Sequence, residues 1–372
     1  LKKRGIHVSP LRGPSPSWNG HSSGWFEFYD ATPETAITWE TSNRDPRVWQ
    51  WCSYLASMTR TIGRRHDEAV HVYVKPHRGA PTQRLLSVLS RGVHSICWYN
   101  YGPPYAQGDE FTSPHQEALM FEVGEAARMA GRAEGVTYGA ERVPETADVA
   151  LLYPRTSFNL RRGYGHTNHF QDAKWVYLAL RHAHVPVDVV DEAMIEDGTL
   201  EGRRALYIVG SHLRESAAKK VLEWTRAGGT VWMDIEGASR NELDRISDTL
   251  VELTGQGERN IELWGQDPGY RATGLPPFRG KEGAYEAPKE AGISAAPLGI
   301  QGAVRGAIGR ETLNDNAGKA LASFSDGRPG VLLRRVGRGR VYLVATFAGL
   351  AYSEDVRRRD FDMGRDLNDA QR

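Results

Sequence analysis

Strand-like and helix-like hydrophobic patterns alternate along the first third of the chain. Short apolar runs predict strands at 5–9, 36–39, 70–74 and 93–99. Apolar residues spaced three and four positions apart predict amphipathic helices over 48–62, 85–89 and 116–130. Gly92 and Gly131 are expected to end the last two of these helices. Such alternation indicates a parallel sheet with its functional residues at the C-terminal ends of the strands.

A second alternation begins near Ala147 and predicts a doubly wound, flavodoxin-like domain. Its expected strands are 149–153, 185–190, 205–210 and 230–234. Its expected helices are 172–182 and 215–226. The stretch 255–320 is rich in Gly, Pro and charge and has weak periodicity, whereas 331–345 predicts a β-hairpin that adds strands to this sheet.

Together the two alternations predict an α/β protein. Four strands cannot close a barrel, so the first region, 1–135, is interpreted as the C-terminal half of a (β/α)8 barrel, with a small open α/β sheet as the alternative. The second domain is expected over 146–355, and 356–372 as the start of a further, truncated segment. Because the chain opens at Leu1 without a methionine or a signal-peptide core, we expect a piece of a longer polypeptide. Any export signal would lie upstream, which leaves the compartment open.

Composition narrows the function classes. The 372 residues carry a formal net charge of +1, so nothing draws the chain to nucleic acid or to a membrane surface. No apolar run has the length of a membrane span, and a soluble protein is expected. Cys52 and Cys97 lie in apolar stretches without metal-type spacing and are interpreted as buried thiols.

Several segments resemble the family 42 β-galactosidases. The segment from Leu85 through Tyr99 looks like the seventh helix and eighth strand of that family's barrel, and 108–110 is similar to its closing loop. The motifs VPVDVV at 185–190, ALYIVGS at 205–211 and AGGTV at 227–231 resemble the family's amidotransferase-like trimerisation domain. The motif GRGRVYLVATF at 337–347 resembles the glycine-rich closing strand of such domains.

The resemblance implies a glycosidase-like protein that acts on β-galactosides or related oligosaccharides. It also implies a homotrimer in which a neighbouring subunit forms part of the active-site wall. No cofactor is implied. The family's acid/base Glu would lie upstream of Leu1. Its nucleophile Glu would end the strand at 70–74, where this chain has Lys75. This departure puts classical retaining catalysis in doubt.

Glu40 is the best remaining catalytic carboxylate, because it follows the predicted strand 36–39. The alternative is that Glu40 caps the loop or pairs with Arg44. Aromatic and polar residues cluster at or after the predicted strand ends, where rings can pack on sugar faces and polar groups can bind hydroxyls. The expected substrate-binding residues are Trp39, Asn43, Lys75, His77, Trp98, Tyr99, Asn100, Tyr101 and Glu110. Packing in the core or at the rim is the alternative for the aromatic residues, and a solvated loop for Glu110.

Other chemistries have weaker signals. An active amidotransferase would need a nucleophilic Cys at 233–237, and there is none. Gly163-Tyr164-Gly165 is interpreted as a flexible turn rather than a dinucleotide motif. His166 and His169 are placed in a surface loop, and no metal site is expected. The run Arg357–Arg359 is interpreted as a solvated helix face, and no Gly-x-Ser-x-Gly elbow is present.

Two functional hypotheses therefore remain. The first is a glycoside hydrolase-like protein with Glu40 as a catalytic group. The second is a non-catalytic carbohydrate-binding or scaffolding protein whose barrel site has degenerated, which Lys75 favours.

Overall fold

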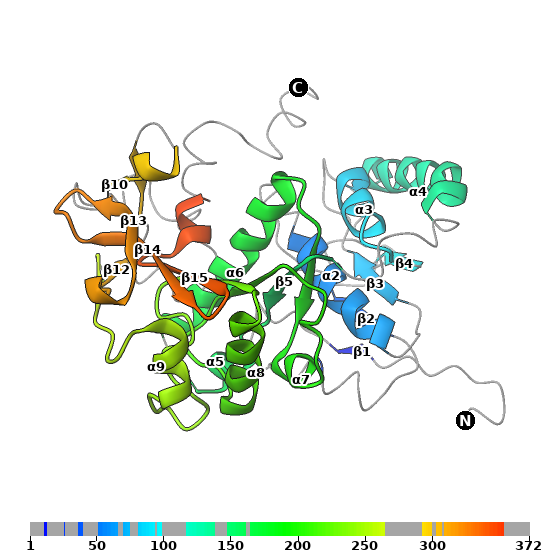
Figure 1. Cartoon of the computed structure of the whole chain (residues 1–372). Coiled ribbons are helices and arrows are strands. Elements are labelled where there is room, and N and C mark those ends of the chain that lie inside the picture. The colour runs from blue at the N-terminus through cyan, green and yellow to red at the C-terminus, as the bar shows by residue number, and fades with distance from the viewer. Residues whose placement is uncertain are drawn as a thin grey trace. The chain divides into compact units, whose positions relative to one another are not determined.

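A computed structural model describes residues 11–12, 26, 36–39, 51–65, 70–74, 81–93, 95–98, 117–137, 147–160, 164–264, 292–299, 303–306 and 309–352. Internal contacts divide the chain into two compact units (Figure 1). The first unit comprises residues 1–146 and 360–372, and the second comprises residues 147–359.

The first unit contains a parallel four-stranded sheet. Its order is β1 (Leu11–Arg12), β2 (Ala36–Trp39), β3 (Val70–Val74) and β4 (Ser95–Trp98). The helices are α2 (Trp51–Arg65), α3 (Pro81–Leu89) and α4 (Glu117–Thr137). The strands predicted at 36–39, 70–74 and 93–99 are confirmed, whereas the strand predicted at 5–9 lies outside the described residues.

Amphipathic spacing explains the helices of this unit. On α2, Leu55, Met58 and Ile62 are buried, as their three- and four-residue spacing predicts. Helix α3 ends at Leu89, and a turn through Gly92 follows, as expected. The prediction that α4 ends at Gly131 is wrong, because α4 continues to Thr137. A glycine within a helix costs only about 1 kcal/mol relative to alanine, so it does not by itself end a helix.

The second unit is built on a nine-stranded sheet whose parallel half has the order β15-β8-β7-β5-β6. These strands are β5 (Val149–Leu152), β6 (Val187–Val190), β7 (Ala205–Ile208), β8 (Thr230–Met233) and β15 (Gly339–Val344). All four strands expected from the second alternation are present, each slightly shorter than predicted. Strand β5 lies between β6 and β7, so the winding direction changes there, as in a doubly wound fold.

An antiparallel half extends this sheet beyond β15. Its strands are β10 (Gly292–Ser294), β11 (Ala303–Arg305), β13 (Lys319–Phe324) and β14 (Pro329–Val336). Strands β9 (Ile261–Leu263) and β12 (Gly309–Glu311) form a separate two-stranded ribbon. The predicted hairpin is confirmed as β14 and β15, and Gly337 at its turn has φ +57°, a conformation that glycine adopts without strain.

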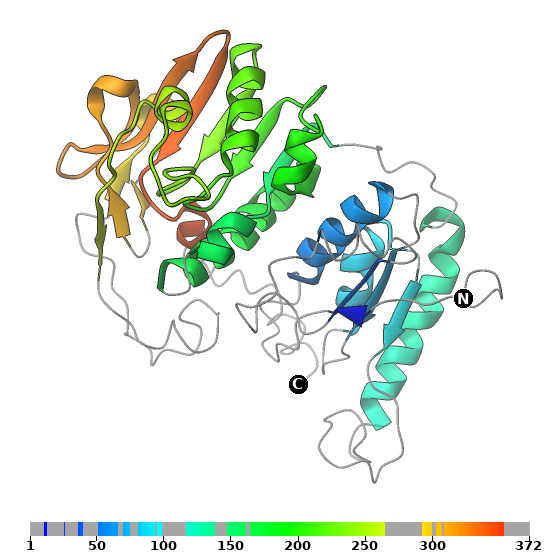
Figure 2. The same cartoon turned by 90° about the horizontal axis from the view of Figure 1, so that it is seen from below.

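Helix α8 packs on one face of the parallel half, and α6 lies on the opposite side, next to β6 (Figure 2). The helices are α5 (Arg155–Leu160), α6 (Tyr164–His182), α7 (Glu192–Glu196), α8 (Glu215–Arg226) and α9 (Asp248–Thr254). Short 3-10 helices span Ala296–Leu298 and Asp315–Ala317. In the described part of the chain, no helix is long and apolar enough to cross a membrane.

The two faces of the sheet differ in their side chains. The covered face, packed against α8, consists of aliphatic residues that are at most 1% exposed: Leu206, Ile208, Val231, Met233, Val341 and Leu343. The opposite face carries Tyr207, Trp232 and Tyr342, which are half-buried, and we call it the aromatic face.

Helix α6 starts earlier than the sequence indicates. Tyr164 and Gly165 are its first residues, so their interpretation as a flexible turn is wrong. His166 and His169 also belong to α6, which corrects their placement in a surface loop. His169 is only 1% exposed and contacts the Phe347 ring, with 5.3 Å between centroids. Tertiary packing, here of His169 against Phe347, can override the weak helix preference of Gly165 and the polar residues.

Candidate functional site

The C-terminal ends of β2, β3 and β4 lie side by side in the first unit. Trp39 pairs with Tyr73, Tyr73 with Cys97, and Val74 with Trp98. Trp39 and Trp98 are thus the last residues of two strands that flank β3. The Trp98 side chain is half-buried. This edge is where parallel α/β folds place their binding and catalytic groups.

The other predicted site residues lie outside the described residues. They are Glu40, Asn43, Lys75, His77, Tyr99, Asn100, Tyr101 and Glu110. Along the chain, Glu40, Lys75 and Tyr99 directly follow the last residues of β2, β3 and β4. The assignment of these residues to a sugar site therefore stays a prediction.

A polar contact joins β3 and β4 near their opposite ends. His71 Nδ1 and Ser95 Oγ are 2.5 Å apart, and the two residues are directly paired in the sheet. Since this contact lies at the N-terminal ends of the strands, it takes no part in the candidate site.

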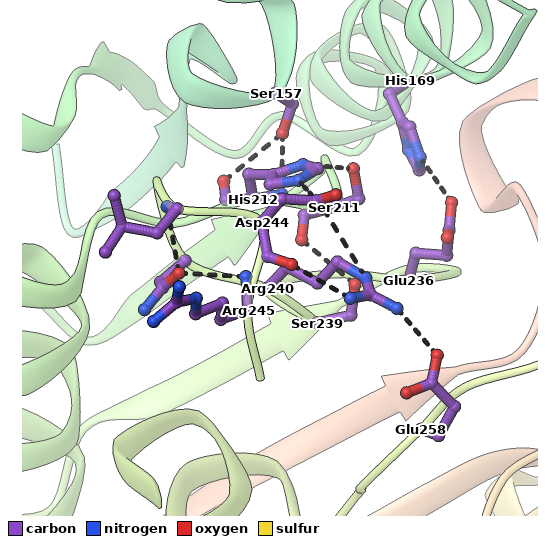
Figure 3. Close-up of polar contacts among 12 residues, drawn as sticks. Ser157, His169, Ser211, His212, Glu236, Ser239, Arg240, Asp244, Arg245 and Glu258 are labelled. Carbon is purple, nitrogen blue, oxygen red and sulfur yellow. Dashed lines mark hydrogen bonds and ion pairs between the residues drawn. The ribbon is translucent and has the colours of Figure 1, made fainter. Parts of the chain in front are cut away.

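The second unit carries a dense polar network at the corresponding edge of its sheet (Figure 3). The His212 backbone N–H donates to Ser157 Oγ at 2.9 Å, and the Ser157 hydroxyl donates to the His212 carbonyl at 3.3 Å. A side chain at Gly210 would place its Cβ 2.8 Å from Pro154 Cβ and from Ser157 Oγ. The segments that follow β5 and β7 therefore approach closely at the point where the winding changes direction.

His212 lies between two further polar side chains. Its Nδ1 is 2.9 Å from Ser211 Oγ, and its Nε2 is 2.9 Å from Asp244 Oδ1. The order Ser–His–Asp resembles a hydrolase triad, but Ser211 is completely buried and the exposed end is the carboxylate. A nucleophile needs access to its substrate, and Ser211 has none. We therefore interpret these hydrogen bonds as holding a loop in place rather than as a catalytic triad.

That loop comprises residues 234–246 and follows β8. Ser239 Oγ and Arg240 N donate to the Ser211 carbonyl at 3.1 and 3.0 Å. Arg240 in turn donates to Glu258 at 2.7 Å (Figure 3). This network is not predicted by the sequence patterns, in which the serines and the histidine after β7 are the one signal that points to it.

The turn directly after β8 is strained. Glu236 has φ +60°, which is uncommon for a residue with a side chain. Its carboxylate is 3.3 Å from His169 Nε2, and its backbone N–H donates to Glu311 Oε2 at 2.8 Å. The stretch 233–237 contains no cysteine, so the nucleophile of an amidotransferase is absent from this turn.

Buried carboxyl groups surround the turn. Burial raises the pKa of Asp172, and the Leu350 backbone N–H donates to its Oδ1 at 2.8 Å. Burial, and then the nearby Asp172 charge, raise the pKa of Asp234 well above its usual range. Burial also raises the pKa of Glu311, which Arg259 opposes from 3.3 Å. Where the structure describes the chain, no three His, Cys, Asp or Glu residues are placed to hold a metal ion.

The two units thus define a protein with two α/β sheets, each with a polar or aromatic edge at the ends of its parallel strands. No family model and no curated protein matches the sequence. Solved structures do match. The β-galactosidase from Bacillus circulans sp. alkalophilus aligns with 92% of this chain and 51% of its own length, at 14% identity and a TM-score of 0.64.

Two further β-galactosidases match in the same way. Gan42B, a GH42 β-galactosidase, aligns with 90% of this chain and 50% of its own, at 14% identity and a TM-score of 0.62. The cold-adapted β-galactosidase from Rahnella sp. R3 aligns with 88% of this chain and 50% of its own, at 17% identity and a TM-score of 0.60. The predicted likeness to family 42 β-galactosidases is therefore confirmed at the level of fold. The chain spans about half the length of these enzymes.

Proposed function

We propose that this chain belongs to a glycoside hydrolase-like protein that acts on β-galactosides or related oligosaccharides. The alignment of the C-terminal ends of β2, β3 and β4 carries the proposal. The fold similarity to β-galactosidases supports the substrate class. In this proposal, residues 1–135 are the C-terminal part of a (β/α)8 barrel. Residues 146–355 form a flavodoxin-like, amidotransferase-like domain.

The proposed site assigns Glu40 as a catalytic carboxylate. Hydrolysis of a glycosidic bond needs two carboxyl groups, one that donates a proton and one that attacks or activates water. Glu40 would supply one of them, and the other would come from elsewhere in the protein. Trp39, Trp98, Tyr99 and Tyr101 would pack against sugar rings. The polar partners of the sugar hydroxyls would be Asn43, Lys75, His77, Asn100 and Glu110.

A carbohydrate-binding protein without catalysis is the second candidate. Lys75 directly follows β3, where the resemblance expects a nucleophilic glutamate. A protonated amine cannot attack a sugar carbon as a carboxylate does. If Lys75 has replaced the nucleophile, the site would keep sugar affinity and lose turnover.

Hydrolysis of a panel of nitrophenyl glycosides separates the two candidates. We expect Glu40→Gln, made in the longest natural form of the polypeptide, to lower kcat at least about 100-fold with sugar affinity nearly unchanged. Glu125→Gln is the matched control, because this glutamate lies on α4 with 65% of its side chain exposed. Unchanged turnover in Glu40→Gln would remove Glu40 from the mechanism. Sugar binding without any turnover in the native protein would favour the second candidate.

We also propose a homotrimer assembled through the second unit. The resemblance of this unit to the family's trimerisation domain supports it. Light scattering on the whole chain should give three times the 41.4 kDa chain mass. A monomer across the concentration range would contradict the proposal.

A further inference from the structure

A row of aromatic side chains crosses the aromatic face of the second unit. Tyr207 on β7 pairs directly with Trp232 on β8, which pairs directly with Tyr342 on β15. Directly paired residues point to the same side of a sheet, so the three rings share this face. The Tyr207 and Trp232 ring centroids are 5.1 Å apart, with 35° between the ring planes.

These rings differ from the aliphatic side chains of the covered face in two respects. All three are half-buried and none belongs to the aliphatic core cluster around α8. Each tyrosine and tryptophan also offers a polar group beside an apolar ring. Burial, with the neighbouring Tyr342 as a second cause, raises the pKa of Tyr207 and keeps its hydroxyl a neutral donor.

Basic residues lie beside this row on the same face. Arg340 is two positions before Tyr342 on β15. Arg335 on β14 pairs directly with Arg340. Lys319 on β13 pairs with Leu333, which itself pairs with Tyr342. All three cationic residues are exposed.

The acidic residue on this face, Asp234, is buried just past the C-terminal end of β8, whereas Arg340 and its partner Arg335 lie level with the N-terminal end of that strand. Like charges placed directly opposite one another destabilise a sheet. Among the described residues, Arg335, Arg340 and Lys319 form no ion pair with an acidic side chain. The neighbouring positions on this face, Ala205 and Thr230, are uncharged. This arrangement is complementary to a ligand that combines flat apolar rings with negative charge.

We propose that the aromatic face binds one chain of an anionic glycan. Its sugar rings lie on Tyr207, Trp232 and Tyr342. Its carboxylate or sulfate groups pair with Arg335, Arg340 and Lys319. The choice of a glycan over other polyanions rests on the proposed function. Single-stranded RNA presents related chemistry, but it requires an extended basic groove. The net charge of +1 provides little general attraction for a nucleic acid.

Calorimetry on the whole chain tests the ligand class with four probes: polygalacturonate, a sulfated galactan, neutral galactan and poly(U). We expect at least one of the two charged glycans to bind, which distinguishes carboxylate from sulfate as the anionic group. Its affinity should fall as salt is added, because exposed charges are screened. Binding of poly(U) or neutral galactan as tightly as the charged glycans would overturn the proposal. Absence of binding by either charged glycan would also overturn it.

Variants locate the bound glycan on the face. The double variant Arg335→Gln/Arg340→Gln changes exposed positions and should weaken binding at least about tenfold, equal to about 1.4 kcal/mol. Its matched control is Lys219→Gln/Lys220→Gln, which removes two charges from α8 on the other side of the sheet. Trp232→Ala should weaken binding by a similar factor, with circular dichroism to verify folding. Equal weakening by the control pair, or no weakening by the arginine pair, would refute the site.

Hydrolysis of nitrophenyl galactosides by the same variants separates this inference from the proposed function. Glycan binding that depends on Arg335 and Arg340, without hydrolysis by the native protein, would remove the catalytic proposal and keep this site. Hydrolysis without any glycan binding at this face would remove this inference alone.

Discussion

The two faces of the nine-stranded sheet share the same strands but have different chemistry. On β7, Leu206 and Ile208 point to the covered face, and Tyr207 between them points to the aromatic face. On β8, Trp232 likewise lies between two buried aliphatic residues. Alternate side chains along a strand point to opposite faces, so a single apolar run supplies two surfaces. The covered face consists of fully buried aliphatic side chains, whereas the aromatic face carries half-buried rings and exposed cations.

The largest expected difference between the faces is in packing energy. Leu206 is fully buried, so Leu206→Ala should lower the free energy of unfolding by about 2–5 kcal/mol. Tyr207→Ala should cost less, despite the larger ring, because the aromatic face already exposes part of that ring to water. Urea unfolding of both variants measures the difference. Equal losses would show that the aromatic face is as much a part of the core as the covered face.

The loops at the C-terminal ends of the parallel strands provide a second comparison. His212→Ala leaves the buried Ser211 hydroxyl without its 2.9 Å partner, and should cost about 1–3 kcal/mol of unfolding free energy. Asp244→Asn is the control, since 65% of the Asp244 side chain is exposed and an amide oxygen can still accept the hydrogen bond. A smaller loss in His212→Ala than in Asp244→Asn would contradict the role of His212 in holding the loop.

Asp234 is two positions after Trp232, so its side chain points to the aromatic face, where its carboxyl group is buried. Burial raises the pKa of Asp234 in the folded state, so the folded protein binds this proton more tightly than the unfolded chain. Its contribution is therefore present at low pH and is lost as pH rises through the raised pKa. Asp172, Glu236 and Glu311 lie close to the Asp234 carboxyl group, and His169 lies beside Asp172 and Glu236.

Asp234→Asn should remove part of this decline, so that the variant gains stability relative to the native protein as pH increases. Thermal unfolding between about pH 5 and 9 measures the effect. Asp148→Asn, at a side chain that is 69% exposed, should leave the pH dependence unchanged. If the stability of the native protein rises with pH across this range, Asp234 does not retain its proton in the folded state.

The smallest expected effect concerns the cations of the aromatic face. Arg335→Gln removes a like charge directly opposite Arg340 and should raise the unfolding free energy by about 0.2–1 kcal/mol at low salt. High salt should abolish this gain. Arg338→Gln in the β14–β15 turn is the control, because that residue has no cross-strand partner. A loss of stability in Arg335→Gln would mean that the guanidinium group has a favourable partner on this face.

Sequence patterns predicted the regular elements with strong periodicity. Helix α8 was predicted over its observed range, and the cores of β2, β3, β7 and β8 were located correctly, since apolar alternation and helical spacing reflect burial. Strands β9 to β12 were missed because each has only three residues and lies among Gly, Pro and charged residues, and β13 was missed because it begins within the same stretch. Local glycines also misled the placement of the end of α4 and the start of α6.

The candidate sites were less predictable than the fold. Residues after β2 and β4 could be proposed from sequence because parallel strands end at one edge. The carboxyl cluster combines Asp172, Asp234 and Glu311 from distant segments, which no spacing reveals. The aromatic row depends on the strand order β7-β8-β15 and on register, neither of which the sequence shows.

The pairing of β8 with β15 also has a kinetic consequence. The two strands are direct neighbours in the parallel sheet, yet the whole antiparallel half lies between them in the chain. Closing so long a loop costs entropy before the pairing returns any energy, and non-local contacts of this kind slow folding. We therefore expect the β5–β8 segment to assemble early and β15 to dock last, with the edge of β8 exposed until it does. During synthesis, that edge stays open until the ribosome has released the hairpin.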